Sequence, residues 1–233
     1  MLQLSGNTDL TGNLLWFVGV VITAFLASWF LTERMHFGRT LYVGALAVVT
    51  GAVTAGYLSW SGLGVEFWTN NWAWGLVGAG VTATVLTLLL SRMIVPSGSH
   101  PNSVGFVQVA WDSVVYGAAE GVLLSVLPLV IVWQAAMGQN VGAMGSGVLA
   151  LAASLVVIVV HHLGYADFRG KKMRQALIGC VPLSLSYLLT GSPIAAIGAH
   201  IVLHYVAMRR GMELPPAEPI QTRRIPSRVA TVS

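Results

Sequence analysis

The sequence predicts an all-α polytopic membrane protein, a bundle of about seven transmembrane helices. Of its 233 residues, 55% are hydrophobic and only 9% are charged, whereas a soluble domain usually carries about 25% charged residues. Apolar segments long enough to cross a bilayer recur along the chain, and lysine and arginine occur only in every second connection between them. These observations exclude an ordinary soluble domain, and the chain contains no recognisable nucleic-acid-binding motif.

Seven apolar segments reach the roughly 17–25 residues that a transmembrane helix requires. They cover residues 13–31, 40–60, 72–95, 104–136, 141–163, 173–189 and 192–208. The fourth is longer than one crossing needs and contains Pro128. Because proline removes a backbone donor, we expect a kink there, with a break into two shorter helices as the alternative. Small residues, as at 78–80 and 142–147, predict close contact between helix backbones.

The positions of the basic residues predict which helix ends are cytoplasmic. They follow the first, third, fifth and seventh segments: Arg34, Arg39, Arg92, Arg169, Lys171, Lys172, Arg174, Arg209, Arg210, Arg223, Arg224 and Arg228. Because cytoplasmic loops are enriched in lysine and arginine, we expect the N-terminus outside the cell and the C-terminus in the cytoplasm. Trp68, Trp72 and Trp74 fit an aromatic belt at the outer interface. The predicted setting is a bacterial plasma membrane, in contact with its lipids.

Three regions follow from this pattern. Residues 1–12 form a short polar tail, residues 13–210 a single transmembrane domain, and residues 211–233 a disordered cytoplasmic tail rich in proline and arginine. The first apolar segment is too long for a cleavable signal and lacks a preceding basic region. The single cysteine, Cys180, excludes a disulfide framework, and its apolar surroundings predict a packing role.

Glu120 is the most informative residue of the fourth segment. Asp112, Tyr116 and Glu120 stand at i, i+4 and i+8, so a regular helix would place them on one face. An ionisable group at bilayer depth costs roughly 2.5–3.5 kcal/mol on the lenient insertion scale. We therefore expect Glu120 to face polar partners from other helices. Asp112 either orients Glu120 or Tyr116, or reaches the cytoplasmic interface.

Histidines near the cytoplasmic ends of two other segments are the predicted partners. His161 and His162 end the fifth segment, and His200 and His204 share one face of the seventh because they are four residues apart. We expect these residues and Glu120 to converge on one polar cavity in the cytoplasmic half. Adjacent helical residues diverge by about 100°, so only one of His161 and His162 is expected to enter it. His36 and His100 lie in predicted loops and carry no expected role.

Such a cluster supports a limited chemistry. A desolvated carboxylate approaches general-base range, and a nearby histidine can donate to a developing oxyanion. Three histidines and a carboxylate also form a ligand set for a divalent metal such as zinc. The candidate ligands are Glu120, His162, His200 and His204. Hydrogen bonding between helices, without catalysis, is the alternative role.

The order of these motifs resembles that of the CPBP intramembrane proteases, the CAAX-protease and bacteriocin-processing family that includes the type II CAAX prenyl endopeptidases. The family motif Glu-Glu-x-x-x-Arg is similar to residues 120–125 (EGVLLS). Its Phe-x-x-x-His motif is similar to residues 158–162 (IVVHH), and its His-x-x-x-Asn motif to residues 200–204 (HIVLH). The resemblance covers residues 104–208, the motif-bearing part, and implies the CPBP fold there.

The resemblance also implies a role for each motif residue. Glu120 would activate water and His162, favoured over His161 by the family register, would assist it. His200 would stabilise the oxyanion together with His204, whose imidazole can donate as an amide does. The sequence departs from the family at four positions: Gly121 for Glu, Ser125 for Arg, Ile158 for Phe and His204 for Asn. Loss of the Glu–Arg pair removes a support that would position the site.

We therefore expect an intramembrane endopeptidase, metal-independent or metal-assisted, that cleaves a peptide or lipidated-protein substrate near the cytoplasmic face. One alternative is a non-catalytic relative that binds another membrane protein or lipid, which the incomplete first motif favours. The other alternative is a small transporter or proton relay that uses the same buried polar residues.

Overall fold

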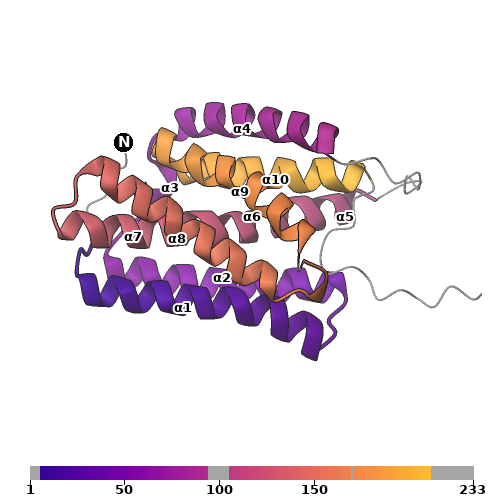
Figure 1. Ribbon diagram of the computed structural model, residues 1–233, viewed down its shortest axis with the longest axis horizontal. Helices are drawn as coiled ribbons and strands as arrows, with labels where there is room; N and C mark the ends of the chain where they lie inside the picture. The colour runs from indigo at the N-terminus through magenta and orange to yellow at the C-terminus, as the bar shows by residue number, and fades with distance from the viewer. Residues whose placement is uncertain (1–5, 94–104, 169, 211–233) are drawn as a thin grey trace, which may run out of the picture.

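The computed structural model describes residues 6–93, 105–168 and 170–210, and no β-strand occurs among them. The long helices run side by side in one bundle (Figure 1). Their order is α1 (Leu10–Trp29), η1 (Phe30–Arg34), α2 (Arg39–Ser61), α3 (Glu66–Thr69), α4 (Trp72–Met93), α5 (Phe106–Val109), η2 (Ala110–Val115), α6 (Tyr116–Glu120), η3 (Gly121–Val126), α7 (Leu127–Gly138), α8 (Ala143–Leu163), η4 (Ala166–Phe168), α9 (Lys171–Thr190) and α10 (Pro193–Arg209). The predicted all-α class is confirmed.

Five stretches of helix are long and apolar enough to cross a membrane. They are Leu10–Arg34, Arg39–Ser61, Trp72–Leu89, Phe106–Gly138 and Ala143–Leu163. The apolar helix α10 is shorter, with 17 residues, and α9 has 20. The structure therefore supports an α-helical membrane protein, while the count of seven crossings stays a prediction.

The helix from Phe106 to Gly138 is the centre of the bundle. Of its apolar span 78% is buried, whereas the other four spans are only 22–33% buried. Helices α1 and α2 lie on one side of it, and α4 and α10 lie on the other (Figure 1). The polar side chains of this helix from Asp112 to Gln134 are consequently buried among other helices instead of facing lipid.

Pro128 does not break the central helix, which continues through it, so the alternative of two shorter helices is wrong. Proline cannot donate to the carbonyl four residues earlier, which belongs to Leu124. Ser154 of α8 donates its hydroxyl to that oxygen at 2.7 Å and also lies 2.7 Å from the Ser184 hydroxyl. The π-helical segment η3 ends at Val126, two residues before the proline. Ser154 thus satisfies the carbonyl that Pro128 leaves unpaired.

Small residues bring α4 close to α9 and α10. A Cβ atom added at Gly78 would lie 2.6 Å from Thr190 Cγ2 in α9 and 3.2 Å from Ala195 Cβ in α10, and one at Gly198 of α10 would lie 2.9 Å from Ala79 Cβ. The predicted close approach is confirmed at residues 78 and 79 but not at Gly80, where an added Cβ atom would have nothing within 4 Å. In the 142–147 run, only Gly147 would meet another helix, at an ordinary 3.7 Å from Trp133.

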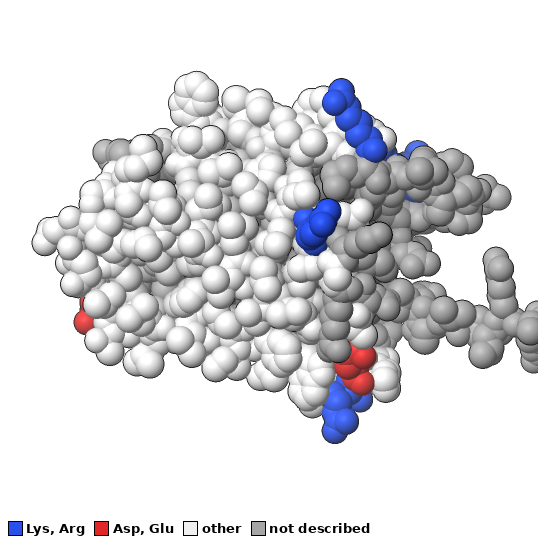
Figure 2. Space-filling model, viewed as in Figure 1, with Lys and Arg blue, Asp and Glu red and all other residues white. Residues whose placement is uncertain are grey.

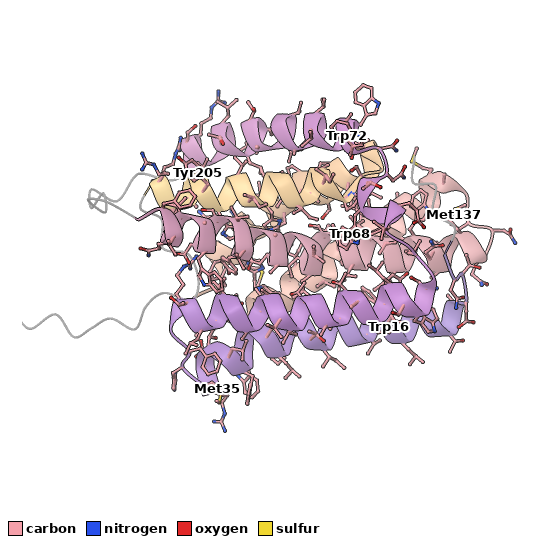
Figure 3. All side chains as sticks on the ribbon, turned by 180° about the vertical axis from the view of Figure 1, so that it is seen from behind. Trp16, Met35, Trp68, Trp72, Met137 and Tyr205 are labelled. Carbon is pink, nitrogen blue, oxygen red and sulfur yellow. The ribbon has the colours of Figure 1, made fainter. Side chains whose placement is uncertain are left out.

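The charged and aromatic residues lie near opposite ends of the bundle. On the face in Figure 2, basic side chains gather toward the end where α1 and α10 finish, a broad uncharged area covers the middle, and an acidic side chain is visible at the other end. Trp68 and Trp72 lie at the opposite end (Figure 3), and Trp72 is 59% exposed. This arrangement is the one that an interfacial aromatic belt requires.

Helix α1 begins at Leu10, three residues before the predicted start, because the Asp9 carboxylate accepts a hydrogen bond from the Gly12 amide at 2.6 Å and caps it. Cys180 is buried and unpaired, as a packing residue should be. His36 is exposed in the connection after η1. His100 and the predicted tail at 211–233 lie outside the described residues.

Candidate catalytic centre

Glu120, the last residue of α6, is the centre of the polar cluster and is only 6% exposed. Its Oε2 atom lies 2.8 Å from His204 Nε2 and 3.8 Å from His200 Nε2. Its Oε1 atom lies 3.3 Å from His161 Nε2. The structure therefore brings a buried carboxylate from the central helix together with histidines from α8 and α10.

Helix α10 presents its two histidines in parallel. The rings of His200 and His204 are 5.6 Å apart with planes only 18° from parallel, as their four-residue spacing predicts. The Tyr116 ring packs against His204 at 4.5 Å between centroids. Both histidines are nearly inaccessible, at 2% and 5% exposure. The predicted convergence of Glu120, His200 and His204 is confirmed.

Two glycines allow α10 to come this close to the central helix. A Cβ atom at Gly117 would lie 2.8 Å from the Ile201 Cα atom, and one at Gly121 would lie 3.1 Å from the Ile197 Cα atom. Both neighbours are backbone atoms, so no side-chain rotation would relieve the crowding. Gly121 occupies the position of the second Glu in the CPBP motif. The close contact with α10 explains why this chain carries glycine there.

A third glycine brings the end of α8 against α1. A Cβ atom at Gly164 would lie 1.9 Å from Ser28 Oγ and 2.8 Å from the Trp29 backbone nitrogen. One turn earlier, His161 Nδ1 lies 3.0 Å from the Ala24 carbonyl oxygen. Since a carbonyl only accepts, this nitrogen carries a proton. The contact with α1 thus fixes the ring that faces Glu120.

The structure places His161, not His162, against Glu120, which corrects the assignment from the family register. His162 Nδ1 donates to the Ile158 carbonyl in its own helix at 2.8 Å, and the ring packs on Phe168 at 4.9 Å. The two adjacent side chains point in different directions, as a helix requires. The histidine beside Glu120 is therefore His161, one residue earlier than the resemblance implies.

Asp112 neither orients Glu120 directly nor reaches the interface as a free carboxylate. It forms an ion pair with Arg39 at the start of α2, at 2.8 Å between Oδ1 and Nε. The Arg39 guanidinium lies 5.1 Å from the centre of the Tyr116 ring. Asp112 therefore supports Tyr116 through Arg39, and both partners are largely buried at this end of the site.

Three residues of this region escaped the sequence reasoning: Arg39, Tyr42 and Tyr165. The sequence predicts Arg39 to be a basic residue of a solvated loop. Only its position one residue before an apolar segment hints that it forms an ion pair within the bundle. Tyr42 and Tyr165 join their hydroxyl groups by a hydrogen bond, and the Tyr165 hydroxyl lies 3.2 Å from His161 Nε2. No spacing rule connects residues this far apart in the chain.

The centre has a geometry in which a metal ion could be held. One ligand atom from each of Glu120, His200 and His204 lies within 4.8 Å of the others, and all three residues are buried. Ligands bound tetrahedrally to zinc at about 2.0–2.1 Å are about 3.3 Å apart, and the observed 2.8 and 3.8 Å lie on either side of that value. His161 and His162 do not belong to this group.

One feature of the two α10 histidines differs from a usual zinc site. A metal-bound histidine normally donates its second ring nitrogen to a carboxylate or carbonyl. In both His200 and His204, Nδ1 is buried without a hydrogen-bond partner among the residues that the structure describes. The three ligand atoms are therefore placed where a metal ion could bind, but the two histidines lack the hydrogen-bond acceptors that usually hold metal-bound imidazoles in place.

No protein-family model matches the chain, and comparison with curated proteins and with solved structures also finds no match. The resemblance to CPBP proteases consequently rests on the motif residues alone. Fold family and activity remain proposals.

Proposed function

We propose that the protein is an intramembrane endopeptidase of the CPBP type that cleaves a membrane or lipidated protein near the cytoplasmic face. The observation that carries the proposal is a buried Glu120 carboxylate whose two oxygens approach histidine Nε2 atoms from two other helices at 2.8–3.8 Å. An intramembrane ionisable group with specific partners is a functional candidate. A carboxylate with neighbouring histidines is also a suitable set for acid–base catalysis.

Each residue has a defined part in the proposed hydrolysis. A carboxylate has about four lone-pair directions, so Glu120 can accept bonds from histidines and still bind a water. Glu120 takes a proton from this water while the water oxygen bonds to the peptide carbonyl carbon. His200 Nε2–H donates to the oxyanion that forms on the carbonyl oxygen. The carbon–nitrogen bond then breaks as the amine receives a proton from Glu120 or His161.

A metal-assisted form uses the same residues differently. Glu120, His200 and His204 would hold a divalent ion such as zinc, which supplies an activated water and polarises the carbonyl. Glu120 would then be a ligand, and His161, 3.3 Å from its Oε1 atom, would hold the proton that leaves the water. His204 is the residue that separates the two forms, because asparagine keeps an amide donor but is a poorer zinc ligand than imidazole.

The test is peptide cleavage by purified protein in lipid nanodiscs, with and without a chelator. The substrates are transmembrane peptides and prenylated peptides, with products identified by mass spectrometry. General-base chemistry predicts cleavage that persists with chelator and survives His204→Asn. A metal-assisted reaction predicts loss under both conditions. Absence of cleavage of every peptide, in buffer with zinc and without it, would contradict the endopeptidase proposal.

A proton relay is the second candidate function, because one observation favours it. Hydrogen bonds connect Tyr42, Tyr165, His161, Glu120 and His204 in a continuous series from α2 to α10. Such chains of ionisable groups mark proton pathways in membrane proteins. Proton flux into liposomes containing the protein, abolished by Glu120→Gln, would support this function, whereas an endopeptidase without a transport role predicts no flux.

We also propose seven crossings, with α9 and α10 spanning the membrane beside the five longer helices and the arginine-rich end facing the cytoplasm. Both helices have at least the 17 residues at the lower limit for a crossing. The test is labelling of single cysteines introduced at the exposed positions Gly38, Asn140 and Leu189, since the native Cys180 is buried. Labelling of positions 140 and 189 only from outside the cell and of position 38 only from the cytoplasm is the expected result, whereas labelling of position 189 from the cytoplasm would contradict the crossings of α9 and α10.

A further inference from the structure

The connection between α8 and α9 folds back onto the catalytic centre. Tyr165 in this connection is only 3% exposed, and its ring lies 5.3 Å from the His161 ring, nearly perpendicular to it at 85°. Its hydroxyl lies 3.2 Å from His161 Nε2 and is hydrogen-bonded to the hydroxyl of Tyr42, which is fully buried in α2. The next residue, Ala166, donates its amide to the Glu33 carboxylate at 3.2 Å. Several contacts therefore hold this segment in place.

The hydrogen bonds of His161 define which role the Tyr165 hydroxyl can have. Nδ1 carries a proton because its partner is the Ala24 carbonyl. Nε2 therefore either accepts a hydrogen bond, from the Tyr165 hydroxyl or from a protonated Glu120, or carries a second proton and donates to these two groups. Burial raises the pKa of the Tyr165 hydroxyl well above its usual range, so this group keeps its own proton throughout. Tyr165 can thus donate to Nε2 when this nitrogen is unprotonated and accept from it when it is protonated.

We propose that Tyr165, held by Tyr42, is a positioning residue that keeps His161 Nε2 directed at Glu120 during the proposed hydrolysis. The predicted effect of Tyr165 on catalysis rests on the proposed function. The positioning of the His161 ring does not, because it follows from the hydrogen bonds alone. The His161 ring is held at one nitrogen by α1 and at the other by Tyr165. Removing the hydroxyl leaves Glu120 as the remaining partner of Nε2, and the ring loses the contact that fixes it independently of the carboxylate.

The test compares Tyr165→Phe with Tyr57→Phe, a matched control. Tyr57 is also fully buried and also hydrogen-bonded, but to Asn13 at 3.1 Å, in a different part of the bundle. In protein labelled with ¹⁵N-histidine, Tyr165→Phe should shift the His161 Nε2 resonance, assigned with His161→Gln, while Tyr57→Phe leaves it in place. For a cleaved peptide, Tyr165→Phe should lower kcat about 10- to 100-fold with KM within about twofold, since small misplacements of catalytic groups have effects of this size.

Tyr42→Phe gives an independent measurement on the same pair. If Tyr42 acts through Tyr165, the effects of the two substitutions on the His161 resonance and on kcat should not add. An unchanged His161 resonance in Tyr165→Phe, or equal loss of kcat in Tyr165→Phe and Tyr57→Phe, would overturn the proposal. Failure of the wild-type protein to cleave any peptide would instead count against the endopeptidase function, because the resonance shift is measured without substrate.

Discussion

Replacing Gly117 with alanine should separate α10 from the central helix and disturb the catalytic centre from a distance. The added Cβ atom would lie 2.8 Å from Ile201 Cα, 3.0 Å from Ile201 N and 3.1 Å from the His200 carbonyl oxygen. Because all three are backbone atoms, α10 itself must move. An ordinary contact begins at 3.4 Å, so the shift is about 0.6 Å. His200 and His204 would move with the helix, and the 2.8 Å hydrogen bond between His204 and Glu120 would lengthen to about 3.4 Å and weaken.

The expected magnitude follows from this displacement. Overpacking of a close contact costs about 1–3 kcal/mol of unfolding free energy, and a misplacement near 1 Å can lower a catalytic rate about 100-fold. We therefore expect a lower midpoint of thermal unfolding in nanodiscs and a 10- to 100-fold loss of peptide cleavage. Cleavage serves as the assay for the centre, and circular dichroism at increasing temperature serves as the assay for stability.

Gly80→Ala is the matched control for this experiment. Gly80 is also in the interior of a long helix, but a Cβ atom there would have nothing within 4 Å. It should leave cleavage unchanged and, since alanine favours helix over glycine, leave stability equal or slightly raised. If Gly117→Ala and Gly80→Ala behave alike in both assays, the close approach of α10 does not position the centre, and the reasoning from Gly117 is refuted.

Three further substitutions test other contacts. His161→Gln should lower cleavage at least tenfold more than His162→Gln, because His161 lies beside Glu120 and His162 bonds within its own helix. Equal losses of cleavage would contradict the assignment of His161 to the site. Ser154→Ala should destabilise the fold by about 1–3 kcal/mol, since it leaves the buried Leu124 carbonyl unpaired; an unchanged unfolding midpoint would show that the carbonyl finds another donor. Gly121→Glu, which recreates the family's acidic pair, should prevent folding of the native bundle, measured as aggregation on gel filtration, and a monodisperse, active variant would contradict the crowding described above.

Much of the centre could be predicted from periodicity along single helices. His200 and His204 share one face because four residues separate them, and the structure confirms that they meet Glu120. Glu120 itself was identifiable because a carboxylate in an apolar segment requires a partner. These inferences depend only on local helix geometry and on the cost of burying charge.

The rest depends on how helices meet, which periodicity does not encode. The choice between His161 and His162 is decided by the rotation of α8 against α1, where Gly164 touches Ser28. The π-helical segments η2 and η3 on either side of α6 also alter the residue spacing along the central helix. Arg39 was expected in a loop, and its pairing with Asp112 joins residues 73 positions apart. Residue spacing along a single helix does not predict such a contact.

The most direct test of the central claim is the ratio of cleavage rates of wild-type protein and Glu120→Gln on one transmembrane peptide, measured under single-turnover conditions in water enriched in ¹⁸O. Glutamine keeps the shape of the side chain but cannot take a proton from water. Glu120 as general base predicts incorporation of one ¹⁸O atom into the new carboxyl group and a rate lowered about 10²- to 10⁴-fold in the variant. A folded Glu120→Gln protein that cleaves the peptide as fast as wild type would contradict the account.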